Sequence, residues 1–516
     1  MTTDARNKRR PGWQAALATG LVAALALVGC SSGDVAETGG TPEVALKVSA
    51  VSPPNSLDPS QLVDGQQMFV WSALFDTLLK RDPMSGELQP NAAESWEYNE
   101  DGTQLTLKLR DGLTFSSGDP VTAEAVAATM LRSKETPGQV QPRFKLVTDV
   151  TAVDDKTVQV SFESFDPQFV ENLAQGPGAI GDPATMDEER TATDPVGSGP
   201  FVLDTAQTVP GSSYVLTKRD DYWDAENIPY SSITVRVLQD PTAAFNALQS
   251  GEINATTVQA QLLGQLDASQ YTTTTIDAVA VAYLNVLDRA GEQWPALGDP
   301  RVRQAISLAI DRQGVLDGIY QGTGRVTEQM FSPYGSAYDE GLDDTYAYDP
   351  EAGKKLVEEA GFAGEKFQIP STFLTTSIEP VLSQAFTDIG LEIEWVTVPP
   401  QQAQSAVSSG QYGLSYQILG FSSDPADAAT NFSASGFGNP RGFTDPTIDE
   451  LFAKINSTIE FQDAVPTYQE LNAYTVDQAF QIPIVFTGSN WVTTDGIVFE
   501  AEANTLSTWR LFKIAE

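Results

Sequence analysis

Asp-Pro dipeptides recur along this chain, and four of them stand immediately before apolar residues with helical spacing: Asp240-Pro241, Asp299-Pro300, Asp349-Pro350 and Asp445-Pro446. An aspartate at the N-cap accepts hydrogen bonds from the free N–H groups of the first helical turn, and proline suits the first helical position. After Asp299 the apolar residues are spaced three and four apart, as on the buried side of a helix: Val302, Ala305, Ile306, Ala309 and Ile310. The pattern predicts helices that begin at these four points and pack one face against a core.

Short segments typical of strands lie between these helices. Residues 94–115 predict a hairpin, because Asp101-Gly102 is a favoured turn and the leucines after it alternate onto one face. Residues 156–164 and 232–239 predict two further strands. Helices and strands alternate along the whole chain, which indicates an α/β fold. A strand over 278–286 followed by a polar, Gly/Pro-bearing stretch predicts that a large lobe ends near 286, and a strand over 481–488 predicts the return to it.

The first thirty residues have the pattern of an export signal. A basic start is followed by an almost wholly apolar run, Ala15 to Gly29, which is short for a membrane-spanning helix. Leu27-Val28-Gly29-Cys30 resembles a bacterial lipobox, which implies lipidation of Cys30 and removal of residues 1–29. Two or three acyl chains hold a protein firmly to a membrane. The alternative is an ordinary signal peptide with a chance cysteine. Residues 30–43 are predicted to be a flexible tether.

Composition excludes several classes of function. Cys30 is the only cysteine and there is no histidine, which excludes an internal disulfide framework, Ser-His-Asp machinery and HExxH zinc sites. No P-loop motif occurs, and the G-x-G-x-x-G match at 176–181 follows no predicted strand, so we expect no nucleotide, no cofactor and no metal site. The formal net charge of −39 argues against nucleic acid as a partner, and it favours either a solubilising surface or cationic ligands.

Several segments, in order along the chain, together resemble one protein family: residues 55–60, 74–126, 195–203, 218–224, 242–254, 299–312, 348–362 and 445–455. This family is the dipeptide/oligopeptide/nickel class, family 5, of the extracytoplasmic solute-binding proteins of ABC importers. One departure is Phe115-Ser116-Ser117-Gly118, where the family usually has Phe-His-Asp-Gly. The resemblance implies a receptor that is not an enzyme, works with permease and ATPase subunits, and is a monomer that touches the membrane only through its lipid anchor.

The fold that this resemblance implies is a two-lobe α/β clam with a hinge. The first lobe is expected to be discontinuous, with residues 44–286 and 488–516 and an inserted subdomain near 70–190. The second lobe is expected to cover 287–487. Ligand binds between the lobes, which close around it.

The resemblance also implies candidate binding residues. In the family's peptide binders an acid that follows a Gly-aromatic pair takes the N-terminal amine, which here indicates Asp424 after Gly420-Phe421, with Asp427 as the competitor. The alternative is that Asp424 only caps a turn before Pro425. Arg441 is the candidate partner for a ligand carboxylate. The candidates for lining side-chain pockets are the aromatic residues Phe421, Phe437 and Trp491. Asp64 and Gln66, after the opening strand, are candidates for the cleft wall.

The ligand stays open among the classes that the resemblance implies. Short peptides are the main hypothesis, and other organic solutes such as oligosaccharides, or metal chelates gripped through their organic part, are the alternatives. The many carboxylates leave a tethered hydrolase with paired acids as a further class. A structural or sensing lipoprotein without a transport role is the third.

Overall fold

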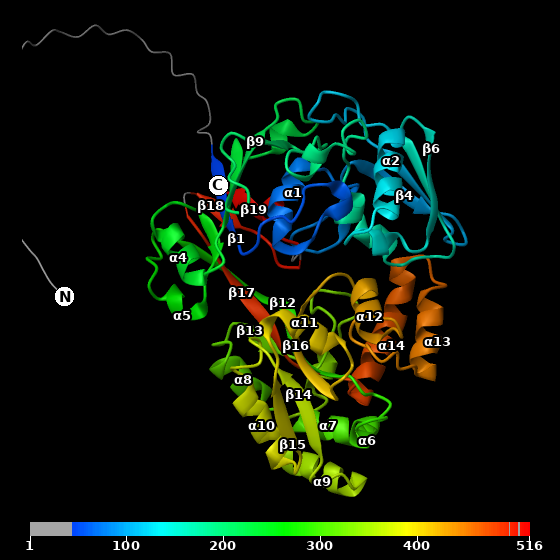
Figure 1. Cartoon of the computed structure of the whole chain (residues 1–516), viewed down its shortest axis with the longest axis vertical. Coiled ribbons are helices and arrows are strands. Elements are labelled where there is room, and N and C mark those ends of the chain that lie inside the picture. The colour runs from blue at the N-terminus through cyan, green and yellow to red at the C-terminus, as the bar shows by residue number, and fades with distance from the viewer. Residues whose placement is uncertain (1–43, 495, 504–505, 516) are drawn as a thin grey trace, which may run out of the picture. The chain divides into compact units, whose positions relative to one another are not determined.

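The computed structural model describes residues 44–494, 496–503 and 506–515. The predicted leader, Cys30 and the whole predicted tether (30–43) therefore lie outside the described residues. From Val44 onward helices and strands alternate along the chain, which confirms the predicted α/β class (Figure 1).

The four Asp-Pro predictions are confirmed. Helices α4 (Pro241–Gln249), α7 (Pro300–Leu308), α9 (Pro350–Ala360) and α13 (Pro446–Ile455) each begin at the proline, with the aspartate as N-cap. Asp240, for example, accepts a hydrogen bond from the Thr242 N–H at 2.7 Å. Helix α9 ends at Gly361, whose φ of 83° is left-handed and therefore suits glycine.

The predicted strands are also present. The hairpin consists of β4 (Ala93–Tyr98) and β5 (Gln104–Leu109), and Gly102 in its turn has a φ of 68°. The strands predicted over 156–164 and 232–239 are β7 (Thr157–Phe162) and β10 (Ser232–Val237). Those predicted over 278–286 and 481–488 lie within the longer strands β12 (Thr272–Val286) and β17 (Gln481–Thr493).

The largest sheet has nine strands. Eight of them follow in the order β16 (Leu414–Gly420), β12 (Thr272–Val286), β17 (Gln481–Thr493), β11 (Ala255–Thr257), β1 (Ala45–Ala50), β10, β9 (Ser213–Lys218) and β8 (Phe201–Leu203). The ninth, β13 (Gly324–Val326), pairs with β17. Several strands that are neighbours in this sheet, such as β16 and β12 or β17 and β11, thus come from segments far apart in the sequence.

Strands β12 and β17 connect the two halves of the sheet. They pair antiparallel along nearly their whole length, with a shift in register between Ile276 and Ala280. On one side of that shift β17 pairs with β11, and on the other side β12 pairs with β16. The long adjacent strands β12 and β17, with the register shift between them, therefore run continuously from one half of the sheet to the other (Figure 1).

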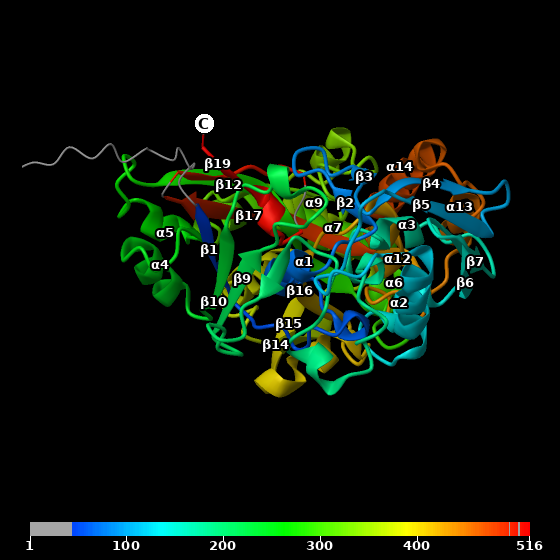
Figure 2. The same cartoon turned by 90° about the horizontal axis from the view of Figure 1, so that it is seen from above.

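A separate four-stranded antiparallel sheet has the order β4, β5, β7 and β6 (Val147–Asp154), and helix α2 (Ala123–Glu135) packs on it. Figure 2 shows this sheet and α2 at the end of the molecule opposite α4 and α5 (Ala260–Leu263). These strands fall within the predicted insertion near 70–190.

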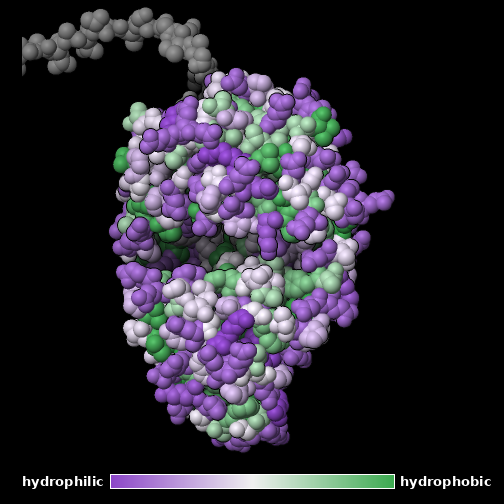
Figure 3. All heavy atoms as spheres, turned by 45° about the vertical axis from the view of Figure 1, so that its right-hand side comes forward, coloured by the Kyte–Doolittle hydropathy of each residue, from purple (hydrophilic) through white to green (hydrophobic). Residues whose placement is uncertain are grey.

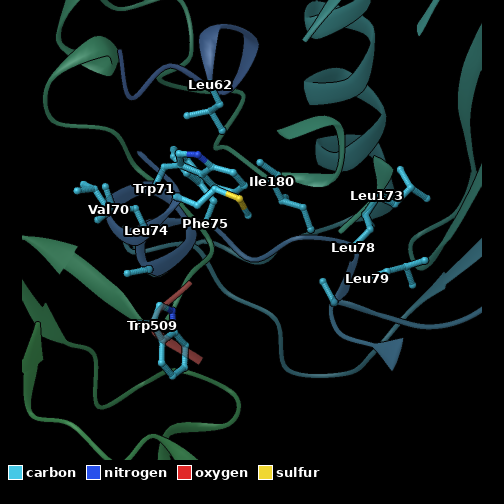
Figure 4. Packing of buried hydrophobic residues seen from close by; sticks show 14 of the residues in the cluster. Leu62, Val70, Trp71, Leu74, Phe75, Leu78, Leu79, Leu173, Ile180 and Trp509 are labelled. Carbon is cyan, nitrogen blue, oxygen red and sulfur yellow. The ribbon is translucent and has the colours of Figure 1, made fainter. Parts of the chain in front are cut away.

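The buried apolar residues form separate clusters toward the two ends of β12 and β17. The largest includes Leu46, Trp71 and Leu107, and it takes in Trp509 from the end of the chain. The Trp509 indole donates to the Ser72 carbonyl of α1 (Met68–Leu74) at 3.2 Å. Figure 4 shows Trp509 together with Trp71 and Leu74 of this helix. Two other clusters are built almost wholly from residues between Ala278 and Phe486. The C-terminal segment therefore packs with the N-terminal part of the chain.

The other strands form two-stranded sheets: β2 (Leu79–Arg81) with β3 (Leu88–Pro90), β14 (Lys366–Ser371) with β15 (Glu392–Thr397), and β18 (Ile497–Phe499) with β19 (Phe512–Ile514). The other α-helices are α3 (Phe169–Asn172), α6 (Pro295–Gly298), α8 (Arg312–Gly318), α10 (Glu379–Asp388), α11 (Ala403–Ser408), α12 (Asp424–Phe432) and α14 (Phe461–Gln478).

Candidate functional site

A cavity of about 440 Å³ lies between two groups of elements. The first group is the β2–β3 hairpin, β4 and α3, which contribute residues 81, 85–88, 96–98, 170 and 171. The second comprises residues 332 and 334–336 and the starts of α12 and α14, with residues 421–425, 427 and 459–462; Ala503 and Leu506 complete the lining. Sites for small organic ligands commonly have volumes of about 300–1,000 Å³. Figure 3, which brings this side of the molecule forward, shows its face hollowed at mid-height beside hydrophobic surface.

Asp424 is the first residue of α12, and its carboxylate is 6% exposed in the cavity wall. Its Oδ2 accepts a hydrogen bond from the Ala337 N–H at 2.9 Å. Burial raises the pKa of Asp424 from 3.8 to about 6, although backbone N–H groups of Ala337 and Ser336 oppose the rise. The carboxylate thus holds the 335–337 segment rather than capping a turn before Pro425, and it borders the cavity. That it binds a ligand amine stays a prediction.

Gly335 is required by this arrangement. A Cβ atom built on Gly335 would lie 2.3 Å from the Asp424 Oδ1, which is far closer than non-bonded atoms approach. Any larger residue there would displace either the carboxylate or the segment that it holds.

Asp427 lies one turn further along α12 and is 5% exposed. Its carboxylate accepts from the Ser422 N–H, with Oδ1 at 3.1 Å. Burial raises the pKa of Asp427 well above its ordinary value, and the nearby Asp424 carboxylate raises it further. Residues three apart on a helix share a face, so both aspartates line the same cavity.

Phe421 is the third candidate that the structure brings to the cavity. Its ring lies edge-on to Phe486, with centroids 5.5 Å apart, so one part of the ring packs in the core. Tyr334 lines the cavity next to it, and its hydroxyl donates to Asp277 of β12. The aromatic residues of this wall are held in place by the core behind them.

Several lining residues were missed by the sequence analysis. Arg81 and Glu171 form an ion pair of 2.5 Å across 90 positions of sequence, and Arg81 also donates to the Gly86 carbonyl at 2.9 Å. Trp96 and Tyr98 of β4 lie beside them. The only local signal was the alternation of apolar and polar residues in the 94–115 hairpin. It predicted the strands but not which face of β4 lies toward the second group of elements.

The structure places Arg441 and Phe437 outside the cavity. The Arg441 guanidinium is 3.3 Å from the carboxylate of Asp288, whose side chain is fully buried, and it also donates to the Gly410 carbonyl. Arg441 is therefore engaged in joining loops of the second half of the chain. Phe437 is 36% exposed and is not among the lining residues.

Trp491, Asp64 and Gln66 also lie away from the cavity. Trp491 is 8% exposed and stacks on Phe499 with ring centroids 4.9 Å apart, in an aromatic cluster of the core. Asp64 forms an ion pair of 2.5 Å with Arg143, and the Gln66 side-chain carbonyl accepts from the Val51 N–H at 2.7 Å. These three side chains are occupied by structural contacts.

Among the described residues, no group of three or more His, Cys, Asp or Glu side chains is arranged to hold a metal ion. Within the same ranges, none of the helices has both the length and the apolar character needed to span a bilayer.

Comparison with known proteins gives a consistent result. The family model described as "Bacterial extracellular solute-binding proteins, family 5 Middle" matches residues 87–441. A nickel-binding periplasmic protein of Escherichia coli K12 is 24% identical over 457 residues, which cover 81% of this chain and 85% of that protein. A dipeptide-binding protein of Pseudomonas aeruginosa is 26% identical over 346 residues, covering 60% of this chain and 62% of that protein.

Solved structures share the fold. The crystal structure of the ABC transporter substrate-binding protein CtaP of Listeria monocytogenes matches with a TM-score of 0.79 and 22% identity, covering 92% of this chain and 100% of that one. The likeness confirms the predicted two-lobe α/β fold.

Proposed function

Because this chain belongs to family 5 of the bacterial extracellular solute-binding proteins, we propose that it captures short peptides between its lobes and delivers them to the permease of an ABC importer. Members of this family are substrate-binding proteins of ABC transporters and are not enzymes. The peptide is the part of the function that the family leaves open, since its members are named for nickel as well as for dipeptides.

The observation that carries the proposal is the cavity with Asp424 in its wall. A free N-terminal ammonium beside a desolvated carboxylate forms a charge-assisted hydrogen bond, one of the stronger polar contacts in proteins. The cavity volume of about 440 Å³ suits a small organic molecule. Its two groups of lining residues come from different core clusters, so a hinge between them brings both into contact with one ligand.

Delivery also requires a partner that recognises the closed, loaded form of the receptor. A ligand shifts the open–closed equilibrium only by its difference in affinity for the two states. We therefore expect the closed, loaded form to dock on permease subunits, while ATP is hydrolysed by a separate partner subunit, because this chain has no P-loop motif.

Lipid attachment is the second part of the proposal. Cys30 follows Leu27-Val28-Gly29 at the end of an apolar run, and residues 31–43 separate it from the described protein. A lipid on Cys30 would hold the receptor at the outer face of the cytoplasmic membrane, within reach of the importer.

The test of the peptide proposal uses pairs of peptides that differ only at the amine. Free trialanine is expected to raise the unfolding temperature, with a stabilisation of about 2.7 kcal/mol at one hundred times its Kd. N-acetyl-trialanine is expected to give no shift. Equal stabilisation by both would contradict the role of Asp424. A panel of free di-, tri- and tetrapeptides of varied side chains that gives no shift at all would contradict peptide binding itself.

A further inference from the structure

The two aspartates at the start of α12 are both buried. Asp424 and Asp427 are 6% and 5% exposed. Among the described residues, neither carboxylate has a lysine or arginine nitrogen within the 4.0 Å that defines an ion pair. Buried carboxylates in proteins are normally paired with a cation or bound to a metal, because an isolated charge in the interior is very unfavourable. Without ligand, burial raises the pKa of both aspartates. A cation bound beside them at the cavity wall would favour their ionised forms.

The same atoms have spare capacity for hydrogen bonds. Asp424 accepts from the 335–337 backbone and Asp427 from the Ser422 N–H. An ionised carboxylate has about four acceptor positions. The hydroxyl of Ser423, which lies between them in the lining, is buried and has no hydrogen-bond partner among the described residues. A ligand with several N–H donors would satisfy these atoms.

The rest of the cavity has the same sign of charge. Among the described residues, six carboxylates and one guanidinium line it, the other carboxylates being those of Glu87, Glu97, Glu171 and Glu460. The guanidinium is that of Arg81, which is already paired with Glu171 at 2.5 Å. An anionic solute would meet repulsion from almost every charged group, whereas a cation would be attracted by the field of the whole cavity.

Aromatic side chains supply the remaining surface. Trp96, Tyr98, Tyr334, Phe421 and Phe461 all line the cavity. Ammonium and guanidinium groups bind over aromatic faces, and the methylene stems of lysine and arginine pack on apolar surface. Carboxylates combined with aromatic rings therefore suit an organic cation.

We propose that the cavity selects solutes with two positive charges, and that for a peptide these are the N-terminal ammonium and a lysine or arginine side chain. This inference rests on the proposed function. Two buried aspartates on one face of α12 neutralise two cations, and one ammonium alone would leave the second carboxylate unpaired. The exposed Glu87, Glu97 and Glu460 attract the solute from the rim of the cavity.

The test is calorimetric titration at pH 7.5 with tripeptides of alanine that carry one lysine at position 1, 2 or 3. The matched probes replace lysine with norleucine, which has a chain of similar length without the charge. At least one lysine peptide is expected to bind ten-fold or more tightly than its norleucine counterpart, and increasing salt is expected to narrow the ratio. Equal affinities at all three positions would overturn the inference while leaving peptide capture intact.

Agmatine, a dication without a peptide bond, separates the two proposals. If agmatine binds while no peptide does, the dication inference holds and peptide capture is wrong. If the norleucine peptides bind, and neither agmatine nor the lysine peptides bind more tightly than they do, the dication inference is wrong while peptide capture stands.

Variants locate the effect in the cavity. Asp427→Asn is expected to remove the preference for lysine and to retain binding of the norleucine peptide. Because Asp427 is buried, Glu460→Gln on the exposed rim gives a second variant that does not disturb the core, and it is expected to reduce the lysine preference in part. Asp220→Asn, an exposed change outside the cavity, is the matched control. An unchanged lysine preference in both cavity variants would place the cationic site elsewhere and contradict the inference.

Discussion

Replacing Asp424 by asparagine should make the ligand-free protein more stable at neutral pH. Asparagine retains an oxygen that can accept from the Ala337 N–H, which Asp424 binds at 2.9 Å, and it removes the buried charge. The folded-state pKa of Asp424 is about 6, against an ordinary value of 3.8. Each pKa unit corresponds to about 1.4 kcal/mol, so ionised Asp424 destabilises the folded protein by about 3 kcal/mol.

The sign of the pH dependence follows from proton binding. Between pH 4 and 6 the folded protein binds more protons at Asp424 than the unfolded chain does, so raising the pH through this range lowers stability. The loss becomes complete about one pH unit above the folded-state pKa, near pH 7. Asp424→Asn lacks this loss, and its advantage over the wild type should grow from a small value near pH 4 to about 3 kcal/mol at pH 7.5.

Urea denaturation of ligand-free protein at pH 4, 5, 6 and 7.5 measures this difference. Asp220→Asn, which is exposed, is the control and should change stability by less than about 0.5 kcal/mol at every pH. If Asp424→Asn is less stable than the wild type at pH 7.5, or if the difference does not vary with pH, the argument that Asp424 is a buried charge kept for binding is refuted.

The remaining predictions concern other steps of the account. Affinity for a free-amine peptide should rise between pH 5 and 7, as Asp424 loses its proton beside Asp427, Glu171 and Arg81. Gly335→Ala should weaken peptide binding at least ten-fold, because its Cβ would lie 2.3 Å from the Asp424 Oδ1. Arg441→Ala should lower the free energy of unfolding by about 2 kcal/mol, because Asp288 loses its cation, and leave Kd unchanged. Cys30→Ser should move the protein from the detergent phase to the aqueous phase.

Each of these has an outcome that contradicts it. Flat affinity from pH 5 to 7 contradicts the titration of Asp424, and normal Kd in Gly335→Ala contradicts the tight contact. A raised Kd with unchanged urea midpoint in Arg441→Ala would show that Arg441 touches ligand. Persistent detergent partition of Cys30→Ser would show that Cys30 is not the site of lipidation.

Local structure could be predicted from the sequence because it depends on near neighbours. An Asp-Pro pair determines where α7 or α13 begins, and Asp101-Gly102 determines the turn of the β4–β5 hairpin. Phe421, Asp424 and Asp427, which the resemblance indicated, line the cavity together because one short segment carries all three. That they bind ligand stays a prediction.

The rest of the site depends on contacts that no local pattern encodes. Arg81 meets Glu171 across 90 positions, and the residues facing α12 come from the β2–β3 hairpin, β4 and α3. Arg441 was a candidate because of its position in sequence, but its guanidinium donates a hydrogen bond to the buried Asp288, 153 positions away. Trp491 was a candidate because it is aromatic, but the core includes Phe499 and Phe512, which pack against it.

The most direct test of the account is a crystal structure of the protein with its tightest-binding lysine tripeptide. We predict that the peptide fills the cavity between the β4 and α12 elements, with its two cationic nitrogens within 4 Å of the carboxylates of Asp424 and Asp427, and that it is chemically intact. A peptide bound elsewhere, for example at the exposed side chains of Phe373 and Ile418, with both aspartates still unpaired, would contradict the account.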